Sequence, residues 1–379
     1  MYIKKSHLSV LLASVLTFGM SGCGSDTDST ITTSLSEVDL AIQHSINFTA
    51  IDAIDGFSQN IETLYNDVET FCTTTNTNTL IAAQSSWTNS YIAWYKVLPF
   101  QFGPLANTDN SSPILDYIDA YRNATESNRT SNLAAINPLI TTLMASAEAI
   151  TQTSFSNTRA KEVGLNVLET ALFTTTSGST DTADIVAEFN AQSTKCDIID
   201  ALSYELTRRT SFVHAQWENN YRETTLSYQY LFTNNLLEDY FSVIDVQGDG
   251  TGTPASEELV VSLQEFLDFA GNANLFTDLT RYSSTTIWQA LEASITTIEN
   301  ILDQTPETEL TLLAIINNNG YEQDVETIEL NIASIKQAIT EQNTTDFTAA
   351  VRALDGNFKT SVLDGLNINK GLTFADGDS

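Results

Sequence analysis

The feature of this 379-residue chain that most constrains its fold is the return of apolar residues every three or four positions over long stretches. Between residues 38 and 72 the positions at this spacing are Ile42, Ile46, Ala50, Ala53, Ile54, Phe57, Ile61, Leu64, Val68 and Phe71. Because an α-helix turns once in 3.6 residues, these side chains line one side of a helix. The stretch therefore predicts one long or kinked amphipathic helix, with Gly56 as a candidate position for a break.

The same spacing recurs along most of the chain. It predicts further helices at residues 79–98, 132–151, 159–173, 182–240 (with interruptions), 256–270, 275–302, 305–317, 324–341 and 345–363. Hardly any segment alternates between apolar and polar residues as a surface strand does. We therefore predict an all-α fold built from helical bundles.

The strongest break in composition is the segment DVQGDGTGTPAS, which begins at Asp245. It resembles a calcium-binding loop in placing Asp245, Asp249 and Gly250 at the first, fifth and sixth positions. Ser256, however, stands where such a loop needs a bidentate glutamate. We interpret residues 245–255 as a Gly-rich connector between two helical-bundle domains, one at residues 37–244 and one at 256–379.

The start of the chain has the pattern of a lipoprotein signal peptide. Two lysines precede an apolar run, which then meets Ser21, Gly22 and Cys23. Residues 1–22 are predicted to be removed, and Cys23 would then carry the lipid. A plain transmembrane anchor is the alternative, but the apolar run is short for a membrane span.

The expected location is the bacterial cell envelope. Gly24 after the lipidated cysteine favours transport to the outer membrane, with the periplasmic and surface faces both left open. Residues 23–36, rich in Ser, Thr and Asp, are predicted to form a flexible tether. The partner expected at this end is therefore the membrane, through the lipid on Cys23.

The net charge is strongly negative. The precursor carries −32; two of its 16 basic residues leave with the signal peptide, so 14 basic residues face 48 acidic ones and the mature chain carries −34. Such a surface repels nucleic acid, which we exclude as a partner. It attracts cations, although a solvated acidic face is the commoner meaning of such a charge.

Two cysteines remain in the mature fold, Cys72 in ETFCTTT and Cys196 in STKCDII. In an oxidising envelope compartment an even pair favours a disulfide. Each lies at the edge of a predicted helix, which suits a link between two helices.

The usual catalytic motifs are missing from the sequence. It has neither the His-Glu-x-x-His zinc motif nor the Gly-x-Ser-x-Gly nucleophile motif. The mature chain has only two histidines, His44 and His214, and a lone helical histidine is more often structural than a ligand.

One polar stripe interrupts an apolar segment. In RAKEVGLNVLETALF, which begins at Arg159, the spacing places Glu162, Asn166 and Glu169 along one side of the predicted helix. The simplest interpretation is a solvated face, but a stripe that points into a cleft would have the same pattern.

Three separated stretches make the chain resemble the imelysin-like family of bacterial envelope proteins. Gly164, Asn166 and Glu169 match its Gly-x-His-x-x-Glu motif. Trp87 and Trp94 match its tryptophan-containing helix, which runs into a Phe-Gly-Pro turn matched by Phe102, Gly103 and Pro104. At the end of the chain Phe374, Asp376, Gly377 and Asp378 match its C-terminal tail.

The resemblance implies two helical bundles related by an ancient duplication, with the motif helix near a groove between them. It implies a groove formed by Gly164, Asn166, Glu169, Glu162, Trp87, Phe102, Gly103, Pro104, Asp376 and Asp378. For the tryptophans, packing in the core is the favoured alternative. For Asp376 and Asp378, it is a structural role at a docked chain end.

The family is described variously as insulin-cleaving peptidases and as iron-regulated or iron-uptake proteins. Asn166 departs from the motif, because an amide is a far poorer transition-metal ligand than imidazole and is not a general base. Glu169 remains able to bind a hard cation or to form a buried ion pair.

Our leading hypothesis is a lipid-anchored binding protein for iron, another divalent cation or a small ligand, with partner proteins of iron uptake or redox chemistry. A peptidase and a structural lipoprotein are the alternatives. The lack of an assignable catalytic set favours a non-enzymatic role.

Overall fold

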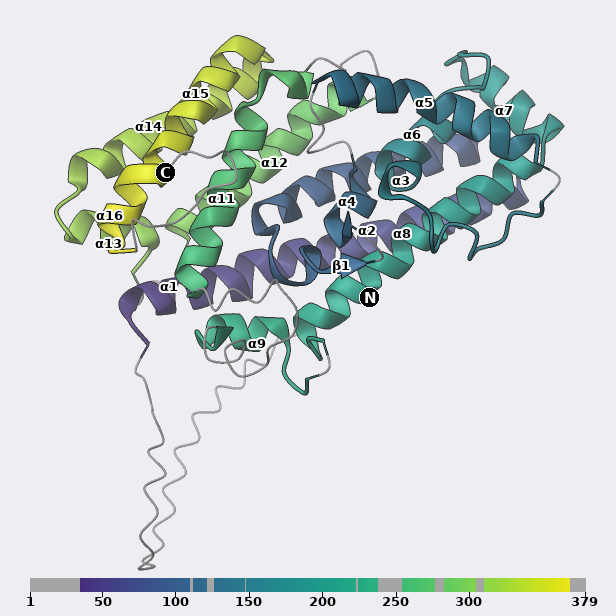
Figure 1. Cartoon of the computed structure of the whole chain (residues 1–379). Helices are drawn as coiled ribbons and strands as arrows, with labels where there is room; N and C mark the ends of the chain where they lie inside the picture. The colour runs from purple at the N-terminus through teal and green to yellow at the C-terminus, as the bar shows by residue number, and fades with distance from the viewer. Residues whose placement is uncertain are drawn as a thin grey trace, which may run out of the picture. The chain divides into compact units, whose positions relative to one another are not determined.

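The computed structural model describes residues 35–109, 112–120, 126–146, 148–222, 224–237, 254–276, 283–304 and 310–368. Most of these residues are helical, which confirms the predicted all-α class (Figure 1). The exception in the described ranges is a short antiparallel pair, β1 (Thr108–Asp109) with β2 (Ser112–Pro113). The predicted signal peptide, Cys23, most of the connector and the C-terminal tail lie outside the described residues.

The first half of the chain supplies most of the helices around the sequence motif. They are α1 (Glu37–Ser45), α2 (Ile51–Thr73), α3 (Thr77–Val97), α4 (Ile114–Ile118), α5 (Glu126–Met144), α6 (Leu165–Phe173), α7 (Thr182–Ala191), α8 (Thr194–Glu218) and α9 (Tyr228–Thr233). Shorter turns of helix are η1 (Ile46–Ala50), η2 (Leu98–Phe100), η3 (Gly103–Leu105) and η4 (Ala160–Glu162).

The second half of the chain is also helical in its described residues. Its elements are α11 (Ala255–Gly271), η5 (Ala273–Phe276), α12 (Ser283–Asp303), α13 (Leu312–Asn318), α14 (Glu322–Glu341), α15 (Thr344–Asn357), η6 (Phe358–Val362) and α16 (Leu363–Gly365).

Local sequence explains where several helices begin. Ser36 and Asp39 form a reciprocal capping box at α1, and Asn76 accepts hydrogen bonds from the first backbone amides of α3. Asn343 does the same at α15. These side chains satisfy amides that have no partner inside the helix, so each fixes a starting point.

The helix predicted at residues 38–72 is confirmed, but the candidate break at Gly56 is not. The stretch is helical throughout, but a wide turn at η1 separates α1 from α2. Gly56 lies inside α2 and causes no break.

In the second half of the chain, α13 begins at Leu312, directly after the capping side chain of Thr311. This start is later than the predicted start at residue 305.

The helices pack in two connected groups. In the first, α2 packs on α3 and α8, while α6 is held by α3, α5 and α8. In the second, α15 packs on α11 and α14 (Figure 1). The contact of α12 with α3 and the contacts of α1 with α11, α12 and α13 join the groups.

The described residues from Leu35 onward form one compact unit. Hydrogen bonds cross between the two groups: Ser294 donates to the carbonyl of Tyr95 at 2.6 Å, and Ser45 donates to that of Ile301 at 3.0 Å. The division into two domains at residues 245–255 stays a prediction.

The predicted disulfide is present. Cys72 at the end of α2 bonds to Cys196 in the first turn of α8, with the two Cα atoms 5.4 Å apart. It fixes the ends of two helices that pack along each other. None of the described helices is both long and apolar enough to cross a membrane.

Candidate functional site

The motif helix begins later than the sequence pattern predicts. The segment at residues 159–173 was expected to form one helix, but η4 ends at Glu162 and α6 starts only at Leu165. Gly164, between them, has φ of 88°, which L-residues rarely adopt. The chain changes direction at this glycine.

A close backbone contact explains why glycine stands there. A Cβ on Gly164 would lie 2.5 Å from the carbonyl oxygen of Ile118 and 2.6 Å from that of Tyr117. Both carbonyls belong to the end of α4. The motif glycine thus brings the start of α6 against α4, with no side chain between them.

The change of direction removes Glu162 from the predicted stripe. Glu162 lies in η4 and forms an ion pair with Arg159, whose side chain is 73% exposed. Only Asn166 and Glu169 therefore share a face of α6. The expectation that all three residues lie along one helix is wrong, because Gly164 ends the continuity of the helix.

Asn166 is held by an acidic residue that no sequence pattern singles out. Its side-chain Nδ2 donates a hydrogen bond to Oδ1 of Asp119, at 2.8 Å. Asp119 follows α4 directly and is 4% exposed. The two residues are 47 positions apart in the sequence, so no local pattern predicts this pairing.

Glu169 is buried in the protein, with 1% of its surface exposed. Its neighbours on α6, Val167, Leu168, Ala171 and Leu172, are also fully buried. The simpler interpretation of the stripe as a solvated face is therefore wrong at Glu169. Burial of a carboxylate is costly, so such groups are retained where they interact with other polar or charged groups.

A third buried acidic residue, Glu205 on α8, is bound by an arginine that packs against α4. The guanidinium carbon of Arg209 lies 3.6 Å from the ring centre of Tyr117, and its Nε donates to Glu205 at 2.6 Å. Arg208 donates to both oxygens of Glu205, at 2.8 and 2.9 Å. Charged groups from α8 thus pack beside the contact between α4 and α6.

Trp87 fixes the first turn of α6. Its indole Nε1 donates a 2.9 Å hydrogen bond to the carbonyl of Leu165, and its ring stacks on Tyr91 with centroids 5.2 Å apart. Trp87 and Trp94 are both fully buried. Trp87 therefore supports the motif helix from the core, the role favoured as the alternative for both tryptophans.

The predicted Phe-Gly-Pro turn packs on helices other than α6. Gly103 has φ of 57°, and a Cβ there would lie 2.4 Å from the ring of Tyr228. Phe102 stacks on Phe232 with centroids 4.9 Å apart, and Pro104 is buried in η3. The turn is confirmed, and its contacts with α8 and α9 form an aromatic cluster. Asp376 and Asp378 lie outside the described residues.

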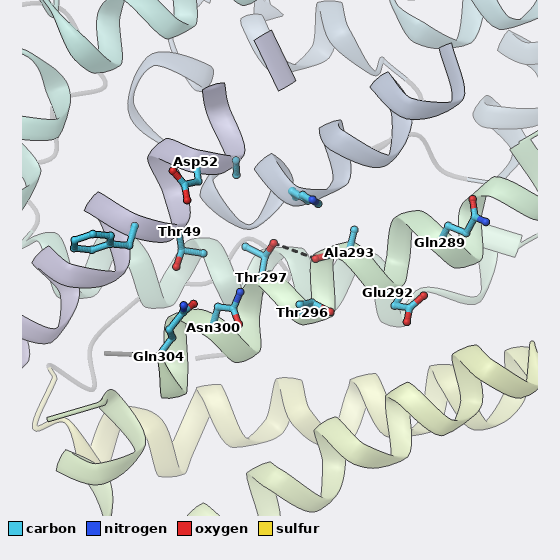
Figure 2. Close-up of a pocket in the computed structure, with 12 residues that line it drawn as sticks. Thr49, Asp52, Gln289, Glu292, Ala293, Thr296, Thr297, Asn300 and Gln304 are labelled. Atoms are coloured by element: carbon cyan, nitrogen blue, oxygen red, sulfur yellow. Dashed lines mark hydrogen bonds between the residues drawn. The ribbon is translucent and has the colours of Figure 1, made fainter. Parts of the chain in front are cut away.

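A polar pocket of about 480 Å³ opens between the first and second groups of helices (Figure 2). It lies between η1 and the start of α2, the end of α3, and the middle and end of α12. Its charged lining residues are Asp52, Lys96 and Glu292. Of the residues predicted to form a groove, none that the structure describes lines it. The groove around Asn166 and Glu169 stays a prediction.

The candidate ligand atoms on and beside α6 are oxygens, in the carboxylates of Asp119 and Glu169 and in the amide of Asn166. Such donors suit hard cations better than imidazole-preferring transition metals. The one group of three His, Cys, Asp or Glu residues in the described ranges with converging donor atoms lies elsewhere, on α2 and α8.

Comparison with known proteins identifies the relatives of this chain. The model of the imelysin family, called Peptidase_M75, matches residues 50–370. No curated protein matches the chain.

Two solved structures share the fold. An imelysin-like protein from Psychrobacter arcticum 273-4 superposes with a TM-score of 0.65 at 15% identity, over 89% of this chain and 99% of that one. A protein from Parabacteroides distasonis ATCC 8503, named as a candidate iron-regulated protein A precursor, superposes with a TM-score of 0.59 at 12% identity. That match covers 86% of this chain and 95% of the other.

Proposed function

The chain belongs to the imelysin family, and from this premise we propose that it is a lipid-anchored binding protein of the bacterial envelope. Its cargo is a cation, iron or another metal ion, bound by oxygen atoms around Asn166 and Glu169. A peptidase is the alternative, for which the sequence holds no assignable catalytic motif.

The envelope location rests on the sequence of the N-terminus. Residues 1–22 have the pattern of a signal peptide, and Cys23 is placed for lipid attachment. The disulfide between Cys72 and Cys196 suits the same oxidising compartment. The name of the Parabacteroides relative, an iron-regulated precursor, agrees with an exported protein connected with iron.

One observation carries the proposed site: the hydrogen bond that joins Asn166 to the buried Asp119, one helical turn from the buried Glu169. Residues three apart on a helix face the same side. The motif helix therefore carries the amide of Asn166 and the carboxylate of Glu169 on one side, and the buried Asp119 accepts a hydrogen bond from that amide. The side-chain nitrogen of Asn166 donates its hydrogen bond to Asp119, and the side-chain oxygen of Asn166 is the atom that would bind a metal ion.

The replacement of the motif histidine changes which cation these residues fit. Imidazole favours zinc, copper and nickel, whereas carboxylate and amide oxygens favour manganese, calcium and magnesium. We propose that Asn166 shifts the preference of the site toward harder cations. The strongly negative surface would raise the local concentration of any cation at its entrance.

Calorimetric titration tests this proposal. Mature protein without a histidine tag, carrying His214→Ala so that the cluster on α2 and α8 cannot contribute, is titrated with Mn²⁺, Ca²⁺ and, under anaerobic conditions, Fe²⁺. Glu169→Gln should weaken the tightest of these interactions by more than about 100-fold, because removing a direct ligand should cost at least as much as removing an outer partner.

Glu162→Gln is the matched control, since it removes the same charge seven residues away from an exposed ion pair. It should leave the affinity unchanged. The proposal fails if no ion binds, or if Glu169→Gln and Glu162→Gln behave alike. Hydrolysis of peptides by the pure protein, abolished by Glu169→Gln, would instead establish the peptidase.

A further inference from the structure

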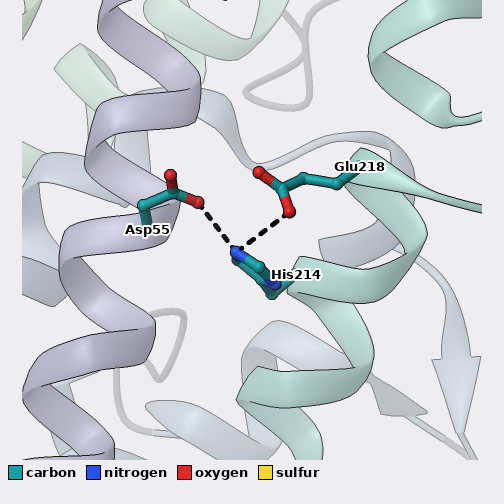
Figure 3. A group of neighbouring side chains, drawn as sticks. All are labelled: Asp55, His214 and Glu218. Carbon is teal, nitrogen blue, oxygen red and sulfur yellow. Dashed lines mark hydrogen bonds and ion pairs between the residues drawn. The ribbon is translucent and has the colours of Figure 1, made fainter. Parts of the chain in front are cut away.

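We propose that Asp55, His214 and Glu218 form a separate binding site for a divalent transition-metal ion, with Zn²⁺ as its representative. The three side chains come from α2 and α8 and converge on one point (Figure 3). Their ligand atoms lie within 4.8 Å of one another. The inference does not depend on the oxygen-donor site at α6.

The distances agree with metal coordination. Nε2 of His214 lies 2.8 Å from Oδ1 of Asp55 and 3.4 Å from Oε2 of Glu218. Zinc binds nitrogen and oxygen at about 2.0–2.1 Å, so two ligands of one ion lie about 2.9–3.4 Å apart at angles between 90° and the tetrahedral value. The third pair, Asp55 and Glu218, is within 4.8 Å, so these two carboxylates would approach each other when they bind the same ion.

Proton counting also favours an ion. A ring nitrogen carries at most one hydrogen, yet two carboxylates face the same Nε2 (Figure 3). A hydrogen on this atom can form a well-aligned hydrogen bond with only one of the two carboxylates. A cation placed among the three atoms would interact with all of them.

The helices hold the three residues in place. His214 and Glu218 are four apart on α8 and therefore face the same side. Asp55 lies on α2 between Ile54 and the next buried position, Phe57. Since α2 packs along α8 and the disulfide fixes their far ends, the two backbones form a rigid frame for the ligands.

The three side chains are exposed enough for a metal ion to reach them from solvent. The side chains of His214, Asp55 and Glu218 are 31%, 34% and 36% exposed, so water can complete the coordination of an ion held by three protein ligands. One imidazole and two carboxylates match a borderline ion rather than a soft one. Zinc should therefore bind more tightly than manganese, and magnesium should bind weakest.

The test uses mature protein with an intact disulfide and no histidine tag. After dialysis against a chelator, it is titrated with Zn²⁺ and, separately, with Co²⁺, whose visible absorption reports its ligands. We expect one equivalent of Zn²⁺ to bind, with the affinity reduced more than about 100-fold by His214→Ala and by Asp55→Asn. The Co²⁺ absorption band should disappear in His214→Ala.

Matched controls separate this site from general attraction to an acidic protein. Glu62→Gln removes one exposed charge from the same helix as Asp55, and His44→Gln removes the other histidine of the described chain. Neither should change zinc affinity, and neither should Glu169→Gln. Circular dichroism confirms that each variant is folded.

Two results would overturn the proposal. One is the absence of stoichiometric zinc binding by the folded protein, and the other is zinc affinity that survives both His214→Ala and Asp55→Asn. Either would make the cluster a plain ion pair between a histidine and two carboxylates. Neither result bears on manganese binding at Glu169, so the two proposals fail independently.

Discussion

Replacing Gly164 with alanine should destabilise the protein by about 4 kcal/mol. Holding a residue with a side chain at φ of 88° costs about 1–3 kcal/mol. The new Cβ would also lie 2.5 and 2.6 Å from two carbonyl oxygens of α4. Relieving such an overlap in a packed interior costs about 1–3 kcal/mol more.

The chain offers a control that separates these two contributions. Gly178 has nearly the same φ, 89°, but no atom lies within 4 Å of a Cβ built there. Gly178→Ala should therefore cost only the conformational part, about 2 kcal/mol. The difference of about 2 kcal/mol between the variants measures the contact between α4 and α6.

Urea unfolding followed by circular dichroism and tryptophan fluorescence measures both variants under the same conditions. The expected order of midpoints is wild type, then Gly178→Ala, then Gly164→Ala. Equal midpoints for the two variants would show that α4 does not lie against Gly164 as described, and the position of Asp119 beside Asn166 would be in doubt with it.

Four further outcomes are expected. Trp87→Phe should cost about 1–2 kcal/mol of unfolding free energy in urea, because the first carbonyl of α6 loses its buried donor. Replacing both Cys72 and Cys196 with serine should cost about 5 kcal/mol, since the bond closes a loop of 124 residues; an unchanged urea midpoint would contradict it. Burial, helped by the charge of Glu265, raises the pKa of Glu258 from 4.5 to about 7. Between these two pH values the folded state thus holds a proton that the unfolded state releases. As pH rises from 4.5 to above 7, the unfolding free energy of the wild type should therefore fall by up to about 3 kcal/mol relative to that of Glu258→Gln. A difference between the two proteins that does not change with pH would refute this. Finally, Cys23→Ala should move the protein from the membrane fraction to the soluble envelope fraction, and retention at the membrane would rule out lipid anchoring.

The helices were predictable because their evidence is local. Apolar spacing located α3, α11 and α14 to within a few residues, and the side-chain cap Asn76 sets the start of α3. The Cys72–Cys196 bond followed from an even number of cysteines in an oxidising compartment.

The start of α6 was not predictable in the same way. A glycine inside a helical pattern is ordinarily tolerated. What ends the helix at Gly164 is a tertiary contact with the carbonyls of Tyr117 and Ile118, and no spacing within residues 159–173 carries that information. The same contact removes Glu162 from the stripe.

The site residues show the same limit. A polar stripe has one pattern whether it faces water or the interior, so the burial of Glu169 emerged only from the packing of α6 on its neighbours. Asp119 and Asp55 lie 47 and 159 positions from the residues they contact. His214, interpreted as a lone structural histidine, has its carboxylate neighbours only once α2 and α8 pack together.

The central claim is that oxygen atoms around Asn166 and Glu169 bind a cation. Anomalous diffraction from crystals grown with Mn²⁺ tests it most directly, because the ion is located without reference to activity. The account predicts an anomalous peak about 2.0–2.5 Å from a carboxylate oxygen of Glu169, on the side of α6 that faces Asp119. Crystals that contain manganese at other positions but show no peak beside Glu169 would contradict it.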